Sequence, residues 1–427
     1  MSRAFSAESM RRRAFTIVEL LASTALLLGL LMLLVGTVDQ TQRVWRRSNE
    51  KATQFQSARA AFESMTRRLS QATLNTYWRA FETDMESEWA DFRFRRQSEL
   101  QFLSGPAVRI FDASPPLPGL HQPISACYPT HAVFFQAPLG YTEEIDHAVG
   151  GSTPLFRKLD NLLTGCGYFI EYGPDHERPE FLAQVPGISD RYRFRLMEMT
   201  VPAERLTIFA RPKDSKGFND PRIFDELQQF PYKGLVQEDG TPEPAWVRPF
   251  WLKDALIRTP IAGQVEGSRF RFARTRAENI IALIIFPKLA ERDRVKIDEP
   301  ELAPHYEYDS WRILVKGQGR VRDGGSFVTV DNVARDNLLP PIVQVTMVAV
   351  DEHSMTRLNL GADNVPEWTN GLFKKARTEA EYYEDLQRLE REQLQKAQLN
   401  YRIFSTDVLI RASKWSRDPS APQASPQ

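Results

Sequence analysis

Residues 15–38 read FTIVELLASTALLLGLLMLLVGTV, and Glu19 is the only charged residue in this run. A helix of this length is about 36 Å long, enough to cross a hydrocarbon core of about 30 Å. A secretory signal has a shorter apolar stretch with a small-residue cleavage site after it. A soluble helix this long normally has a polar face. We therefore expect residues 15–38 to form a membrane-spanning helix.

Both flanks of the apolar run are basic. Residues 1–14 read MSRAFSAESMRRRA and contain four arginines and one glutamate. Arg43, Arg46 and Arg47 follow the run on its other side. Positive charge normally marks the cytoplasmic side of a membrane helix, so the charges alone give only a weak indication of orientation here.

Glu19 is the unusual residue of the run, because a carboxylate inside a bilayer helix costs about 2–3 kcal/mol and such residues usually have a function. One interpretation is a plain signal anchor whose Glu19 side chain reaches the lipid headgroups. The other requires a cut between Ala14 and Phe15, which creates an α-amine about one helical turn from Glu19. In a bundle of such helices, the amine of one subunit would pair with the carboxylate of its neighbour and offset the cost of burial.

The stretch RRRAFTIVELL (residues 11–21) resembles the class III signal of type IV pilins and type II secretion pseudopilins. The resemblance implies that a prepilin peptidase cuts after Ala14, that Phe15 becomes an N-methylated N-terminus, and that Glu19 sets the register of assembly. The family usually has glycine where Ala14 stands, so we expect slower cleavage. The resemblance also implies a single-pass protein of the inner (cytoplasmic) membrane, with a cytoplasmic N-terminus and a periplasmic globular head.

The helical pattern continues beyond the apolar run. One stripe of apolar residues recurs at spacings of three and four: Phe55, Ala58, Phe62, Met65, Leu69 and Ala72. No proline occurs before Pro106. We therefore expect residues 39–78 to extend the helix as an amphipathic half that packs against the head.

Residues 79–415 have the pattern of short strands and turns, which predicts an α+β fold with an antiparallel, β-rich head similar to that of a pilin. The expected strands are Ala107–Phe111, His131–Gln136, Gly167–Tyr172, Arg191–Met197, Ile280–Phe286, Trp311–Val315, Phe327–Val330, Ile342–Val350 and Tyr401–Ala412. Asp323-Gly324-Gly325 predicts a hairpin turn.

Three further segments stand out in the head. Residues 202–260 are rich in proline and predict an irregular excursion. Residues 373–398 predict a charged helix with one apolar edge, formed by Tyr382, Leu386 and Leu389. Residues 416–427 have the composition of a disordered tail.

Four stretches resemble the Verru_Chthon cassette protein C family, whose members carry prepilin signals and are encoded in multi-gene cassettes in Verrucomicrobia. They are LSQATLNTYW (69–78), HAVFFQAPLG (131–140), GYFIEYG (167–173) and YRFRLMEMTVPAERL (192–206). The resemblance supplies no biochemical role. More distantly, the layout is similar to J-type minor pseudopilins and W-type minor pilins, which have a long helix and a large β-rich head near the tip of a short filament.

No motif for catalysis is present. The six histidines lack the i, i+4 spacing of a helical zinc site, and there is no G-x-S-x-G. His131 opens a strand and is interpreted as a packing or hydrogen-bonding residue. Asp331, Asp336 and Asn337 match no calcium motif and are interpreted as surface residues. We therefore expect no enzymatic activity, no cofactor and no metal.

Cys127 and Cys166 are the only cysteines. In an oxidising periplasm they would form one disulfide, worth about 3–4 kcal/mol on the chain-entropy model. Two buried free thiols are the alternative, and the sequence leaves both open because it gives no distance between them.

These observations favour a minor pseudopilin subunit, because a head of this size is bulky for a repeating filament subunit. The expected partners are a prepilin peptidase, other prepilin-like subunits and inner-membrane lipid. Nucleic acid is excluded because 55 basic residues balance 55 acidic ones. The alternatives are a signal-anchored periplasmic binding module or enzyme, and a secreted protein released by a cut after the apolar run.

Overall fold

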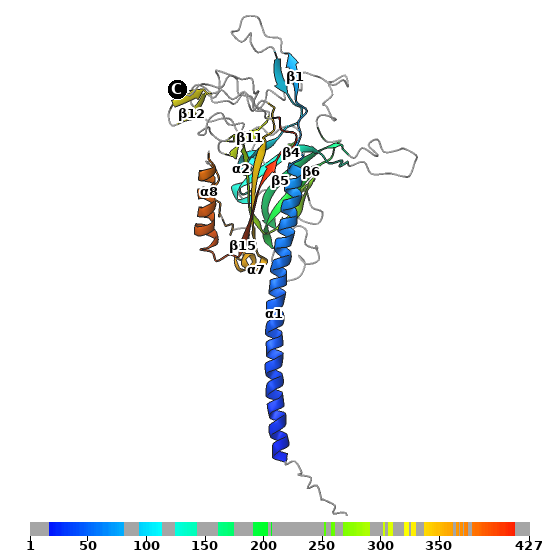
Figure 1. Cartoon of the computed structure of the whole chain (residues 1–427), viewed down its shortest axis with the longest axis vertical. Coiled ribbons are helices and arrows are strands. Elements are labelled where there is room, and N and C mark those ends of the chain that lie inside the picture. Colours follow the sequence, from blue (N-terminus) through cyan, green and yellow to red (C-terminus); the bar gives the residue numbers. More distant parts are fainter. Residues whose placement is uncertain are drawn as a thin grey trace, which may run out of the picture. The chain divides into compact units, whose positions relative to one another are not determined.

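The computed structural model (Figure 1) describes most of the chain. The described residues are 17–80, 94–112, 124–142, 161–174, 191–203, 206, 252, 258–260, 268–290, 302–303, 306–310, 320–323, 326–329, 337–361, 364–366, 368–369, 371–374 and 378–414. The chain divides into two compact units, Met1–Gln54 and Phe55–Gln427. The second unit is called the head below.

The first element is the helix α1, Ile17–Leu69. Within the head its side chains form the predicted apolar stripe, of which Ala58, Phe62, Met65 and Leu69 are buried. The predicted extension to residue 78 is wrong, because the chain after Leu69 turns to the sheet and Thr73 N–H donates to the carbonyl oxygen of Gln136 at 2.9 Å.

The head is built on a six-stranded antiparallel sheet with the order β11-β3-β4-β5-β6-β9. The strands are β3 Leu103–Pro106, β4 His131–Pro138, β5 Leu163–Pro174, β6 Tyr192–Val201, β9 Ala273–Glu278 and β11 Tyr308–Asp309. The three central strands β4, β5 and β6 are buried almost throughout. Side chains on both faces of these strands are therefore mostly apolar, whereas β9 at the sheet edge alternates between partly buried and exposed residues.

A three-stranded antiparallel sheet accompanies the larger one. Its order is β10-β14-β15, formed by Ile280–Lys288, Ile342–Val350 and Tyr401–Leu409. One face is covered by the helix α8, Glu379–Arg388, through the hydrogen bond between the Tyr382 and Thr346 hydroxyls at 2.6 Å. On the other face Phe62 of α1 contacts Phe404 of β15, with ring centroids 5.8 Å apart.

Two hydrophobic cores hold the head together. The main core joins the end of α1, one face of the six-stranded sheet, and the three-stranded sheet. The second core lies on the opposite face of the six-stranded sheet and includes the short helices α2, Ala107–Asp112, and α3, Ile124–Cys127. There the rings of Phe111 and Tyr128 stack with centroids 4.1 Å apart.

The remaining described elements are small. A π-helical turn, η6 Leu389–Leu394, continues α8, and α7, Glu352–Arg357, follows β14. Three two-stranded ribbons pair β1 Tyr77–Ala80 with β2 Phe94–Gln97, β7 Arg258–Pro260 with β8 Ser268–Phe270, and β12 Arg320–Asp323 with β13 Ser326–Thr329. Asp323 pairs with Ser326, which confirms the predicted hairpin.

The coarse prediction of an α+β fold is confirmed, with a long apolar helix and a head rich in antiparallel sheet. The strands expected at residues 131–136, 167–172, 191–197, 280–286, 327–330, 342–350 and 401–412 all occur, with bounds shifted at several ends. The one expected at Trp311–Val315 lies outside the described residues, as do the tail 416–427 and most of the excursion 202–260.

Two predicted elements need correction. Ala107–Phe111 is the helix α2 rather than a strand, because Ala107, Ile110 and Phe111 have helical spacing and bury one side in the second core. The charged helix predicted at 373–398 begins at Glu379 instead, where the Thr378 side chain accepts a hydrogen bond from Glu381 N–H as an N-cap. Its apolar edge is confirmed, since Tyr382 and Leu389 are buried.

Candidate functional site

The N-terminal part of α1 is long and apolar enough to cross a membrane. The segment Ile17–Arg46 contains a window with a mean hydropathy of 2.4 of which 0% is buried. It is the only helix of this kind among the described residues. The helix is compatible with membrane anchoring, and a signal sequence meets the same criteria.

Three hydroxyl side chains inside this segment donate their hydrogen bonds within the helix. Ser23, Thr24 and Thr37 each donate a hydroxyl hydrogen to the carbonyl oxygen three residues earlier, at 2.8–3.0 Å. Such bonds remove the cost of placing an unpaired hydroxyl in hydrocarbon. The residues that interrupt the apolar run are therefore suited to a lipid environment.

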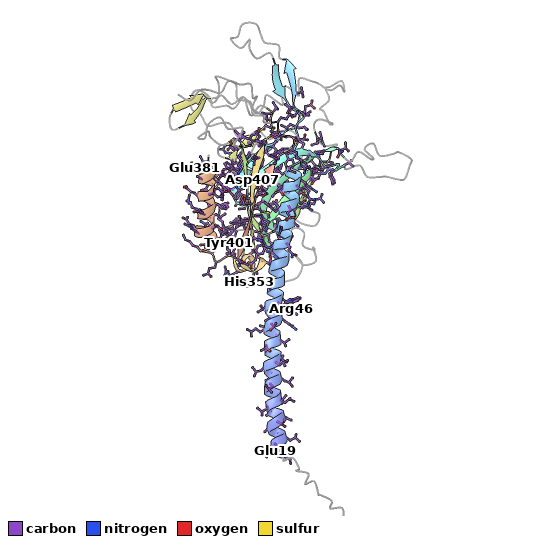
Figure 2. The ribbon with its side chains drawn as sticks, viewed as in Figure 1. Glu19, Arg46, His353, Glu381, Tyr401 and Asp407 are labelled. Atoms are coloured by element: carbon purple, nitrogen blue, oxygen red, sulfur yellow. The ribbon has the colours of Figure 1, made fainter. Side chains whose placement is uncertain are left out.

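Glu19 is the one carboxylate of this segment before Asp39, and it lies among exposed apolar side chains. It lies in the first turn of α1, where a negative charge interacts favourably with the helix dipole (Figure 2). Ala14 and Phe15 lie outside the described residues. The cleavage site, the N-methylation of Phe15 and the assembly role of Glu19 therefore stay predictions.

The head contains a pocket of about 560 Å³ between α2, α3, the start of β4 and residues 366–374. Two cations, Arg109 and Lys374, contribute to its lining, together with Glu307, which forms an ion pair with Arg109. Ser125 and Thr369 add hydroxyls, and most of the remaining lining is apolar. A concave apolar site with a few polar groups is what a small ligand requires.

His131 lines the same pocket, but both of its ring nitrogens form hydrogen bonds with backbone groups of the head. Its Nδ1 accepts a hydrogen bond from Ile285 N–H at 3.0 Å, so Nε2 carries the hydrogen and donates to the Phe373 carbonyl oxygen at 2.9 Å. Burial lowers the pKa of His131 to about 4. The ring is neutral at physiological pH and has no nitrogen available for a ligand, which confirms its prediction as a hydrogen-bonding residue.

Within the described ranges, no group of three or more His, Cys, Asp or Glu side chains is placed to hold a metal ion. Of the three residues considered for calcium, only Asn337 is described. It is 3% exposed, so its interpretation as a surface residue is wrong. Asp331 and Asp336 lie outside the described residues.

Cys127 and Cys166 are both free and buried. Cys127 belongs to the second core and Cys166 to the main core, so the sheet separates their side chains. Burial raises the pKa of Cys166 to about 12. Of the two alternatives that the sequence leaves open, the structure has two buried free thiols.

A buried cluster of charges fixes the end of α1 to the sheet. Glu198 in the middle of β6 is 1% exposed, and its Oε1 lies 2.5 Å from Arg68 Nη1 and accepts a hydrogen bond from the Tyr168 hydroxyl at 2.8 Å. Arg276 Nε and Arg274 Nε of β9 lie 3.1 and 3.9 Å from its Oε2. Our sequence interpretation missed this cluster, although a lone glutamate inside the apolar strand LMEMT was a signal for it.

No protein-family model matches the chain, and comparisons with curated proteins and with solved structures also give no match. Function is therefore inferred from the residues themselves.

Proposed function

We propose that the chain is a membrane-inserted, prepilin-like subunit of the minor pseudopilin type. The observation that carries the proposal is the exposed apolar segment of α1, in which Glu19 is the one carboxylate before Asp39. In the sequence, a basic stretch that ends at Ala14 precedes this segment. The head, which is rich in antiparallel sheet, is the second support.

In this proposal a prepilin peptidase cuts after Ala14 and the new Phe15 amine is N-methylated. The apolar segments of several subunits then bundle, and Glu19 of one subunit pairs with the Phe15 amine of its neighbour, which offsets the cost of burying both charges. The product is a type II secretion or type IV pilus-like filament or tip complex, anchored in the inner membrane, with the head in the periplasm. The large head favours a minor or tip position.

Processing and assembly are tested separately with two substitutions in cells that contain a prepilin peptidase. Ala14→Val places a branched side chain before the scissile bond and should leave the leader attached, while Ala14→Gly should be cut at least as fast as the native chain. Glu19→Gln should be cut normally but should fail to cross-link to neighbouring subunits. Native-like cross-linking of Glu19→Gln would contradict the assembly role.

A signal-anchored binding module is the second candidate, and the pocket beside Arg109 favours it. This function requires the anchor but neither cleavage nor bundling. Arg109→Ala should then abolish the biological effect of the chain while leaving its processing unchanged. A chain that works normally with Arg109→Ala but fails with Glu19→Gln would exclude the binding module.

A further inference from the structure

The pocket beside Arg109 has stiff walls made largely of rings. Its volume of about 560 Å³ lies within the range of small-molecule sites, which is about 300–1,000 Å³. The rings that contribute to its lining are those of Pro106, Pro129, Pro366, Phe194 and Phe373. Proline is fixed in φ, and aromatic faces pack well against the C–H edges of other rings. The walls therefore suit a flat ring system better than a flexible chain.

The backbone around this pocket is strained. Thr130 and Phe373 line the pocket with φ angles of 64° and 54°, and Tyr306, with a φ of 63°, directly precedes the lining residue Glu307. In the part of the chain that the structure describes, no other β-branched or aromatic residue has a positive φ. Such residues rarely adopt this conformation, and strained backbone of this kind is concentrated at functional sites.

Hydrogen bonds from the surrounding head hold the strained residues in place. Phe373 N–H donates to Asp385 Oδ2 at 2.8 Å, and the Phe373 carbonyl oxygen accepts from His131 Nε2 at 2.9 Å. The Thr130 hydroxyl accepts from a backbone N–H of β10 at 3.0 Å, and the rings of His131 and Tyr306 have centroids 4.6 Å apart. The shape of the pocket is therefore fixed before a ligand arrives, which lowers the cost of binding a rigid ligand.

The charged side chains of the lining favour an anion. They are two cations, Arg109 and Lys374, and one carboxylate, Glu307, which accepts a hydrogen bond from Nη1 of Arg109. Asp385 is not part of the lining, and Arg388 lies 3.9 Å from its Oδ1. Glu307 is 8% exposed, whereas the side chains of Arg109 and Lys374 are exposed and therefore lie at the mouth of the pocket. One bound monoanion makes the charges of the lining balance.

We propose that this pocket binds an aromatic monocarboxylate. The ring system lies between the proline and phenylalanine walls, and the carboxylate lies at the mouth beside Arg109 and Lys374. A guanidinium group has five N–H donors, so Arg109 can bind a ligand carboxylate while Nη1 contacts Glu307. The proposal names a ligand class for the binding module that is the second candidate function, and it rests on that candidate. It requires neither cleavage at Ala14 nor bundling of the apolar helices.

The test uses the full-length chain in nanodiscs of uncharged phosphatidylcholine and 6-fluoro-2-naphthoate as the probe, observed by fluorine NMR. The native chain should broaden the probe signal in a saturable way, and empty nanodiscs should not. The neutral analogue 2-naphthamide should displace the probe at concentrations about tenfold higher than 2-naphthoate requires, because it lacks the charge. Equal displacement by the amide, or equal broadening with empty nanodiscs, would overturn the proposal.

Four variants locate the probe in the pocket. Val108→Trp fills the cavity without changing a charge and should abolish binding. Arg109→Gln with Glu307→Gln removes the guanidinium group together with the carboxylate that it compensates, and should weaken binding about tenfold. Lys374→Gln should weaken binding about threefold, since an exposed charge contributes less. Lys396→Gln removes an exposed lysine outside the lining and is the matched control, which should bind like the native chain.

Thermal unfolding shows which variants fold, and if Val108→Trp does not, the double variant and Lys374→Gln decide. Native-like binding in every folded pocket variant would overturn the proposal, because the probe would then bind elsewhere. The uncut Ala14→Val chain should bind the probe like the native chain. A failure of prepilin processing is therefore distinguishable from a failure of ligand binding.

Discussion

Arg68 in the last turn of α1 lies 2.5 Å from Glu198 of β6, a carboxylate that is 1% exposed. Removing the guanidinium group leaves a buried charge with less compensation. We therefore expect Arg68→Ala to lower the free energy of unfolding by about 1.5–3 kcal/mol, measured by denaturant titration of the full chain in detergent.

The control for this prediction lies on the same helix. Arg59 pairs with Glu63 at 2.8 Å, but both side chains are more than half exposed. Arg59→Ala should therefore cost less than about 0.5 kcal/mol. Equal losses in the two variants would mean that the buried pair does not hold α1 to the sheet.

Gly167 of β5 leaves room for an aromatic ring. A Cβ atom at this position would lie 2.4 Å from Cδ1 of Phe134, its cross-strand partner in β4. Gly167→Ala should destabilise the head by about 1–3 kcal/mol, and Phe134→Leu in the same chain should recover part of the loss. Gly173→Ala in the same strand is the control, because its nearest contact is the flexible end of Arg195 at 3.6 Å. Thermal unfolding of these three variants and of the native chain measures the difference.

The stability of the head should depend on pH through His131. Its pKa is lowered to about 4 in the folded chain, so the unfolded chain binds the proton more tightly. The contribution of neutral His131 to the free energy of unfolding is therefore largest above pH 6.5 and is lost as the pH falls toward 4. Between about pH 7.5 and about pH 5.5 the loss attributable to His131 should be about 1 kcal/mol.

His131→Leu should be less stable at every pH but should have a flatter profile over this interval. A profile as steep as that of the native chain would assign the pH dependence to other groups.

Both thiols should be inert in the folded chain. Cys127 and Cys166 are buried, and a raised pKa keeps Cys166 protonated. A maleimide reagent should label neither cysteine under native conditions and both after denaturation without reductant. If labelling of the denatured chain requires reductant, the two cysteines are bridged and the arrangement of the cores is wrong.

The sequence predicts the parts of the fold that have strong local patterns. The apolar run, the stripe from Ala58 to Leu69, and strands such as Ile342–Val350 follow directly from hydrophobic periodicity. Ala107–Phe111 was misassigned because a short apolar run fits a strand as well as one turn of buried helix. The end of α1 at Leu69 is set by a backbone hydrogen bond to β4, which no local pattern reveals.

Only part of the candidate site can be predicted from the sequence, because some of its residues have a local signal and others are identified only by tertiary contacts. Glu19 is visible in the sequence because it interrupts an apolar run, and His131 was assigned to hydrogen bonding because it opens a strand. The partners of His131 come from Ile285 and Phe373, which are 154 and 242 residues away. The pocket beside Arg109 and the arginines around Glu198 likewise depend on tertiary contacts, so sequence alone does not give them.

The mass of the mature N-terminal peptide, from protein isolated from its native membrane, tests the central claim most directly. A peptide that begins with N-methylated Phe15 is the predicted result and would establish prepilin processing. A peptide that begins at Met1, in cells whose prepilin peptidase is active on another substrate, would contradict the account and leave an anchored globular head.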